Sequence, residues 1–191
     1  MRRQLAKTSA GVIVALGLLA GCSIHQAATD QVTPARPPGY EAHNTADVAF
    51  VQQMIPLQER AIALSDALLT KPGVNPYVTD LATSIKSIDG PEITQMQGWL
   101  TGWGNPDGVV NGGGVAEMAS DPSPADIEGA DPSRAATLFL RQMITNRERA
   151  LALSKAEIDA GEYRVTVAVA RANQVTQQRQ ITTMKSLLGS P

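Results

Sequence analysis

Apolar residues recur along the chain at alternating spacings of three and four residues. The clearest stripe consists of Phe50, Met54, Leu57, Ala61, Leu64 and Leu68. Side chains at these spacings share one face of an α-helix, so the stripe predicts a helix over residues 45–70 that buries this face in a bundle. Lys71-Pro72-Gly73 is expected to end the helix, because proline and glycine do not continue a helix easily.

A second helix is expected to begin at Asn75-Pro76, which offers an N-cap followed by proline at the first helical position. Its apolar face continues with Val78, Leu81, Ala82, Ile85 and Ile88. The segment Asp89-Gly90-Pro91 interrupts this face and predicts a kink or a restart, because proline clashes with the preceding helical turn. Residues 44–103 are therefore predicted to form a helical hairpin.

The second half of the chain repeats the first. Residues 50–65 align with residues 139–154 at an offset of 89 positions, and a shorter match follows at an offset of 88. Residues 132–191 are therefore predicted to form a second hairpin, joined to the first by a flexible crossover linker over residues 104–131 that is rich in glycine and proline. Two such hairpins predict an all-α fold, a four-helix bundle in which each hairpin covers the apolar face of the other.

Residues 1–21 have the order of a bacterial secretion signal, with a short cationic start followed by an apolar run of about a dozen residues. The run is shorter than the roughly 20 residues that cross a bilayer as a helix. Residues 19–22, Leu-Ala-Gly-Cys, resemble the lipobox of bacterial lipoproteins. This resemblance implies cleavage before Cys22 and attachment of a diacylglycerol to its thiol, which would anchor the protein to the extracytoplasmic face of the cell membrane.

Residues 22–43 contain mostly Ala, Thr, Gln and Pro and almost no large apolar side chains. Such a segment cannot bury enough surface to fold, so we interpret it as a disordered tether. Both histidines of the chain, His25 and His43, fall in this tether or at its end, and we interpret them as solvated linker residues.

The charge pattern and the motifs exclude several classes of function. Without the signal segment the chain keeps 13 basic against 18 acidic residues, and no basic cluster appears that would suit nucleic acid. The region expected to fold has no histidine, no Gly-x-Ser-x-Gly motif, no phosphate-binding glycine loop and no Glu-x-x-His pair. The sequence therefore predicts a protein that is not an enzyme.

Both halves carry a pattern that resembles the domain of unknown function 305 family. The family pattern has Phe, then Met-Ile-x-His-His-x-x-Ala, then Gln-x-x-Glu-Ile-x-x-Met, and ends in Trp-Leu or Leu-Leu. The first half matches at Phe50, Met54-Ile55, Ala61, Glu92-Ile93, Met96 and Trp99-Leu100. The second half matches at Phe139, Met143-Ile144, Ala150, Ile181, Met184 and Leu187-Leu188. The resemblance implies a ferritin-like helical bundle of the type found in envelope and secreted proteins of bacteria.

The chain departs from this family pattern at the histidines. Leu57-Gln58 and Asn146-Arg147 stand where the pattern has paired histidines, and Asp89 stands for one glutamine. Because some family members handle copper, the resemblance leaves a thioether site for cuprous ion as a hypothesis. Its candidate ligands are Met54, Met96, Met143, Met184 and Glu92. The alternative is that methionines at these positions only fill the core.

Arg147 is expected to lie near the position of the lost histidines, where an unpaired cation would be costly. One hypothesis is a structural ion pair between Arg147 and either Glu92 or Asp89 of the other hairpin. The alternative is that Arg147 belongs to a charged face exposed to solvent, since Glu148 and Arg149 follow it.

These observations favour a non-catalytic, lipid-anchored protein of the cell envelope that acts as a binding or structural module without a cofactor. The membrane is its predicted contact, through the lipidated Cys22. A homodimer or a second envelope protein is a further hypothesis, based on the acidic, apolar-striped helices. The alternative function is a periplasmic or cell-surface copper-binding protein that uses the methionines and His25 or His43.

Overall fold

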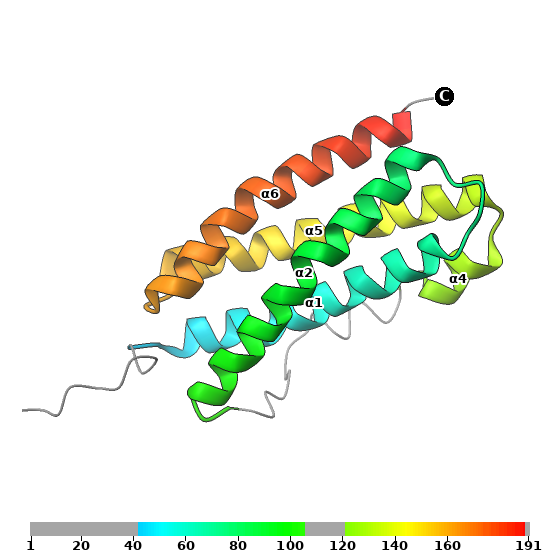
Figure 1. Cartoon of the computed structure of the whole chain (residues 1–191). Coiled ribbons are helices and arrows are strands. Elements are labelled where there is room, and N and C mark those ends of the chain that lie inside the picture. Colours follow the sequence, from blue (N-terminus) through cyan, green and yellow to red (C-terminus); the bar gives the residue numbers. More distant parts are fainter. Residues whose placement is uncertain (1–41, 106–120, 190–191) are drawn as a thin grey trace, which may run out of the picture. The chain divides into compact units, whose positions relative to one another are not determined.

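The computed structural model describes residues 42–105 and 121–189, and the elements within these ranges are helices (Figure 1). One hairpin consists of α1 (Thr45–Leu69) and α2 (Pro76–Gly102), and the other consists of α5 (Pro132–Ala160) and α6 (Arg164–Gly189). A short helix, α4 (Pro124–Gly129), precedes the second hairpin. The prediction of an all-α fold built from two helical hairpins is confirmed.

Several expectations concern residues outside these ranges. The secretion signal, Cys22, His25 and most of the tether lie outside the described residues, as does the triple glycine of the crossover linker. What the sequence indicates about them stays a prediction. Within the described ranges, no helix combines the length and the apolar character that crossing a bilayer requires.

Local sequence determines where the long helices begin. Asn44 caps α1, because its side chain accepts from the backbone N–H groups of Ala46 and Asp47, while Asp47 accepts from the Asn44 N–H at 2.6 Å. Asn75 caps α2 and Asp131 caps α5, each followed by proline. The start predicted at Asn75-Pro76 is confirmed, and Asp131-Pro132 begins α5 in the same way. In both cases the cap side chain satisfies an N–H group that a first helical turn leaves without a partner.

Helix α2 runs without a break through Pro91, so the expected restart at this point is wrong. A proline inside a helix removes one backbone donor and strains the preceding turn. Ile85 and Ile93, on either side of this position, are both buried and hold the two parts of α2 against the bundle. Tertiary packing therefore outweighs the local cost of the proline.

Part of the predicted linker is folded against the bundle. Ile127 of α4 is completely buried, and α4 packs against both α1 and α5. Arg60 Nη2 donates to the Pro122 carbonyl at 2.8 Å, and Lys71 Nζ donates to the Glu128 carbonyl at 2.6 Å. The segment around α4 thus departs from the expectation of a flexible connection. This packing could not be recognised from the sequence. One buried apolar side chain makes no periodic pattern, and the two cations that bind the segment lie far from it along the chain.

Helices α1 and α5 pack against each other at the centre, and α2 and α6 each pack mainly against the other helix of their own hairpin. Figure 1 shows α1 and α5 running in opposite directions. Because the two hairpins are repeats of each other, this arrangement places equivalent residues on opposite sides of the point where α1 and α5 cross.

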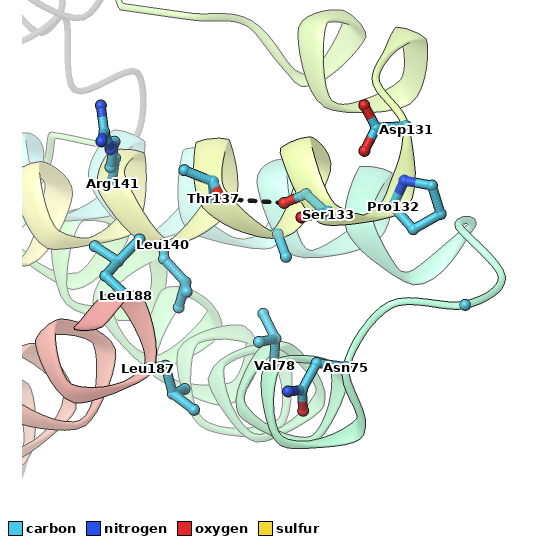
Figure 2. Close-up of a pocket in the computed structure, with 12 residues that line it drawn as sticks. Asn75, Val78, Asp131, Pro132, Ser133, Thr137, Leu140, Arg141, Leu187 and Leu188 are labelled. Carbon is cyan, nitrogen blue, oxygen red and sulfur yellow. Dashed lines mark hydrogen bonds between the residues drawn. The ribbon is translucent and has the colours of Figure 1, made fainter. Parts of the chain in front are cut away.

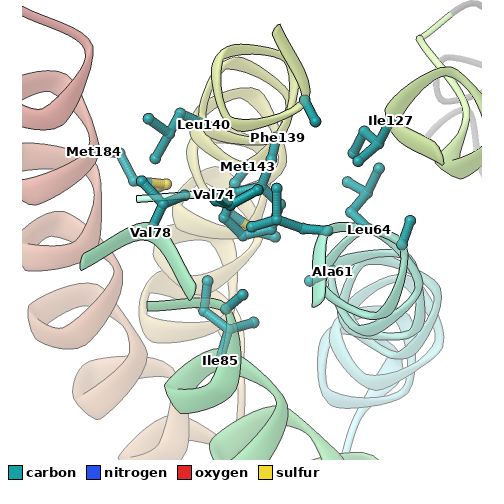
Figure 3. Packing of buried hydrophobic residues seen from close by; sticks show 14 of the residues in the cluster. Ala61, Leu64, Val74, Val78, Ile85, Ile127, Phe139, Leu140, Met143 and Met184 are labelled. Carbon is teal, nitrogen blue, oxygen red and sulfur yellow. The ribbon is translucent and has the colours of Figure 1, made fainter. Parts of the chain in front are cut away.

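The buried apolar side chains form two clusters. The Phe139 cluster draws on all four long helices and on α4 (Figure 3). Its largest fully buried members are Leu64, Leu68, Ile85, Ile127, Phe139, Met143 and Met184. The Phe50 cluster contains Phe50, Val51, Met54, Leu57, Met96, Leu100, Ala150 and Ala170. Phe50 and Phe139 occupy equivalent positions of the repeat, so each half contributes the same aromatic anchor to one cluster.

Candidate functional site

A polar layer separates the two apolar clusters. On each long helix its residues come between members of the Phe50 cluster and members of the Phe139 cluster, and they are Gln58, Asp89, Glu92, Asn146, Arg147, Asn173 and Gln177. All of them are buried except Glu92, which is half-buried. Polar groups at this depth require partners, so the layer is the first candidate for a site.

Arg147 of α5 and Asp89 of α2 form an ion pair in this layer, with 2.8 Å between Nη2 and Oδ2. The Arg147 side chain is 1% exposed, which excludes the alternative that it lies on a charged surface. Burial raises the pKa of the Asp89 carboxyl above its ordinary value; the charge and hydrogen bond of Arg147 oppose this rise, and the charge of Glu92 adds to it. The pair joins the second hairpin to the first.

Glu92, the other carboxylate considered for Arg147, is bound by amides. Its Oε2 accepts from Gln58 Nε2 at 2.6 Å and from Asn173 Nδ2 at 3.4 Å. Asn146 Nδ2 donates to the carbonyl of Leu57 at 2.9 Å. Together with the ion pair, these bonds connect all four long helices through the layer.

Several atoms of the layer have no hydrogen-bond partner within the described protein. They are Gln58 Oε1, Asn146 Oδ1, Gln177 Oε1, Arg147 Nε and Arg147 Nη1. A buried polar atom without a partner costs about 1–3 kcal/mol, and groups of this kind are the ones that hold buried water in proteins. Replacing buried charged groups by apolar side chains of similar volume is often neutral or stabilising, so net stability alone does not explain the layer.

The four candidate thioethers do not form one site. Met54 and Met96 belong to the Phe50 cluster, whereas Met143 and Met184 belong to the Phe139 cluster. Met54 and Met143 both precede the polar layer by one helical turn, but α1 and α5 run in opposite directions, so they fall on opposite sides of it. The structure thus does not bring the four candidate thioethers of the copper hypothesis together at one place. Across the described ranges, no three His, Cys, Asp or Glu side chains are grouped so that they could hold a metal ion.

His43 is not the solvated linker residue that the sequence indicated. Its ring stacks on Trp103, with 4.7 Å between the centroids and 13° between the planes. Tyr163 meets Trp103 and Trp99 edge-on, at centroid distances of 5.4 and 5.8 Å. This aromatic group packs the start of α1 against the end of α2 and the α5–α6 turn. The spacing of Trp99 and Trp103, four residues apart on one helix face, could have indicated it.

Two buried acids lie at the same end of the bundle, Asp47 on α1 and Glu157 on α5. Sequence reasoning missed both. The pattern Asn44-x-x-Asp47 is a capping signature that could have drawn attention to Asp47. Glu157 has no comparable signal, because a charged residue in the last turns of a helix is ordinarily exposed.

A cavity of about 650 Å³ lies where α2 and α5 begin and α6 ends (Figure 2). Its lining includes Asn75, Asp131, Leu187 and Leu188. The side chains of Asn75 and Asp131 already cap the two helices, and no lining residue has a buried polar atom without a partner. The cavity therefore offers no group directed at a ligand, and the polar layer remains the candidate site.

Comparisons with known proteins connect this arrangement to one family. Residues 47–188 match the family described as domain of unknown function (DUF305). The chain is similar to the crystal structure of a DUF305 fragment from Deinococcus radiodurans, with 28% identity and a TM-score of 0.69 over 78% of this chain and 99% of that chain. None of the curated proteins compared with the chain matches it.

Two further structures share the fold at lower identity. A DUF305 protein from Streptomyces coelicolor is 21% identical, with a TM-score of 0.66 over 75% of this chain and 91% of that chain. CopM in its Cu(I)-bound form is 21% identical, with a TM-score of 0.58 over 74% of this chain and 94% of that chain. At this level of identity the likeness shows the fold alone.

Proposed function

The chain belongs to the DUF305 family, and from this membership we propose that it is a non-catalytic protein of the cell envelope, anchored by a lipid on Cys22. In this proposal the polar layer is a structural device that fixes how the two hairpins pair. The observation that carries the proposal is the buried ion pair between Arg147 and Asp89 at 2.8 Å.

The chemistry of Arg147 argues against a metal in the layer. Asn146-Arg147 stands where the family pattern resembled by this chain has paired histidines. A guanidinium has no lone pair to offer a metal and stays positively charged at any ordinary pH. A cation placed beside it would be repelled rather than bound.

A copper-binding function is the second candidate. It is supported by the buried methionine pairs, Met54 with Met96 and Met143 with Met184, because thioethers are ligands that cuprous ion prefers. The similarity in fold to CopM in its Cu(I)-bound form is a second reason to test copper binding.

One experiment separates the two candidates. Thermal unfolding of residues 23–191 is measured with and without cuprous ion under reducing conditions, since a ligand that binds the folded state raises its stability by mass action. The structural proposal expects an unchanged midpoint. A rise that Met54→Leu together with Met143→Leu abolishes, and that Met118→Leu leaves intact, would support copper binding and overturn the structural proposal.

Lipid anchoring is tested separately. Cells expressing the full chain are labelled with radioactive palmitate, and the membrane fraction is compared with that of Cys22→Ser. We expect label and membrane association for the natural chain and neither for the variant, because one thiol carries the diacylglycerol. An unlabelled natural chain recovered outside the membrane fraction would refute the anchor.

A further inference from the structure

Asp47 fastens the first turn of α1 to the turn between α5 and α6. Its carboxylate accepts from the N–H groups of Asn44 at 2.6 Å, Tyr163 at 2.9 Å and Glu162 at 3.2 Å, and from Thr166 Oγ1 at 2.8 Å. These donors come from both hairpins. Burial raises the pKa of Asp47, but the hydrogen bonds outweigh it and hold this pKa below the ordinary value.

Glu157 faces this carboxylate from the last turns of α5. The residue is 1% exposed, and neither of its carboxyl oxygens has a hydrogen-bond partner of good geometry. Burial raises its pKa to about 7; the nearby Thr166 hydroxyl opposes the rise, and the nearby Asp47 carboxylate adds to it. A protonated Glu157 can donate to Asp47, whereas an ionised one repels it.

The α5–α6 turn passes close to the Glu157 carboxyl. A β-carbon added at Gly161 would overlap the Oε1 atom of Glu157, which shows how closely the backbone passes. Because Glu157 is 1% exposed, ionisation of its carboxyl is costly in this position.

No described cation neutralises the two acids. Lys155 on α5 pairs with Asp159 at the surface, and Arg164 on α6 is exposed. None of the ion pairs formed within residues 42–105 and 121–189 includes Asp47 or Glu157. At the end of α2, Trp99 and Trp103 meet Tyr163 with uncharged rings, and His43 stacks on Trp103 without an ion pair to either acid.

We propose that Asp47 and Glu157 form a proton-dependent latch, which holds the start of α1 on the α5–α6 turn while Glu157 keeps its proton. When the Glu157 O–H bond breaks, the proton passes to solvent and two buried carboxylates remain at the same end of the bundle. They repel each other, so the latch loosens. The latch therefore controls how firmly the first turn of α1 is held against the α5–α6 turn.

The latch is tested by hydrogen exchange in the full chain. Exchange of the Glu162 and Tyr163 N–H groups is measured from pH 4.5 to pH 8.5 and corrected for the intrinsic dependence on pH. Because the closed state binds the proton more tightly than the open state, we expect protection to fall at least tenfold between pH 5 and pH 7 and to level off above pH 7. Protection that does not change over this interval overturns the latch.

Two variants and one titration complete the test. Glu157→Gln keeps the shape and a permanent donor, so its protection should not depend on pH; Glu162→Gln, on the exposed side of the same turn, should behave as the natural chain. The carboxyl carbon of Glu157, followed by NMR in the natural chain, should titrate near pH 7. A midpoint near 4.5, or a pH dependence that survives in Glu157→Gln and disappears in His43→Phe, would assign the effect elsewhere and overturn the proposal.

Discussion

Arg147 and Asp89 form a buried ion pair at positions where the two halves of the repeat differ. The residue equivalent to Arg147 in the first half is Gln58, and the residue equivalent to Asp89 in the second half is Gln177. Each half therefore supplies one charge that the other half lacks. A buried pair of this kind adds little net stability, but removing one partner leaves an uncompensated charge.

Arg147→Met should destabilise the protein by about 3–5 kcal/mol at pH 7, because Asp89 would remain buried without its partner. The loss should shrink at lower pH, since burial already raises the pKa of Asp89 and protonation removes the unpaired charge. Urea unfolding measures both effects.

The double variant Arg147→Met with Asp89→Leu should recover most of this loss, because no charge stays behind. Lys185→Met, which breaks the exposed pair with Glu148, is the control and should change stability by less than about 1 kcal/mol. If the double variant is as unstable as Arg147→Met alone, the unpaired charge of Asp89 is not the cause of the loss. The polar layer as a whole would then depend on these two side chains.

The stability of the protein should be highest in mildly acidic solution. The folded-state pKa of Glu157, about 7, lies above its ordinary 4.5, so its contribution is complete below pH 4.5, is lost as pH rises towards 7 and then stays constant. The folded-state pKa of Asp47 lies below its ordinary 3.8, so its contribution is lost as pH falls below that value.

Unfolding midpoints between pH 3 and pH 9 check this profile. Glu157→Gln should flatten the decline on the neutral side and leave the acid side unchanged. If the variant keeps the decline between pH 4.5 and pH 7, another group causes it.

Gly161→Ala should destabilise the protein by about 1–3 kcal/mol, because its β-carbon would overlap the Glu157 carboxyl in a packed turn. The backbone at Gly161 is extended with a negative φ, so strain of the main chain does not contribute. In the presence of Glu157→Ala the cost should become smaller but not vanish, because the added β-carbon also lies 2.7 Å from the backbone carbonyl oxygen of residue 157. A double-mutant cycle measures the part that is due to the Glu157 side chain.

Gly98→Ala should act in the opposite direction. Gly98 lies on the exposed side of α2, and nothing lies within 4 Å of an added β-carbon. Alanine at such a helical position should stabilise the protein by about 0.5–1 kcal/mol. Thermal unfolding of both variants therefore compares position 161, where an added β-carbon meets Glu157, with position 98, where an added β-carbon meets nothing.

Ile127→Ala should lower stability by about 2–5 kcal/mol if α4 unfolds together with the bundle. Val175→Ala, at a position that is 60% exposed, should change it by less than about 0.5 kcal/mol. A negligible effect of Ile127→Ala would show that α4 detaches before the four long helices unfold.

The sequence predicted those parts of the fold that depend on local chemistry. The stripe from Phe50 to Leu68 and the caps at Asn75 and Asp131 act over a few residues, so they can be recognised from spacing alone. The repeat then implied the pairing of two hairpins. The restart expected at Pro91 is wrong, because burial on both sides of this proline outweighs its local cost.

The site was less accessible to sequence reasoning. Helical phase could suggest that Arg147 points inward, but the choice of Asp89 over Glu92 depends on how α2 lies against α5. The contact between Asp47 and Glu157 joins residues 110 positions apart, and no local pattern encodes it. The division of the methionines between two clusters follows from the opposite directions of α1 and α5, which spacing within one helix does not reveal.

The asymmetric charges of the polar layer also determine which hairpins can assemble. A bundle made from two copies of the first hairpin would place two buried Asp89 and two half-buried Glu92 carboxylates at its centre, with no cation between them. Two copies of the second hairpin would bury two guanidinium groups and no anion. Either mistake would cost several kcal/mol, whereas the natural pair is nearly balanced. The duplicated halves are thus complementary: each hairpin favours the other hairpin over a second copy of itself.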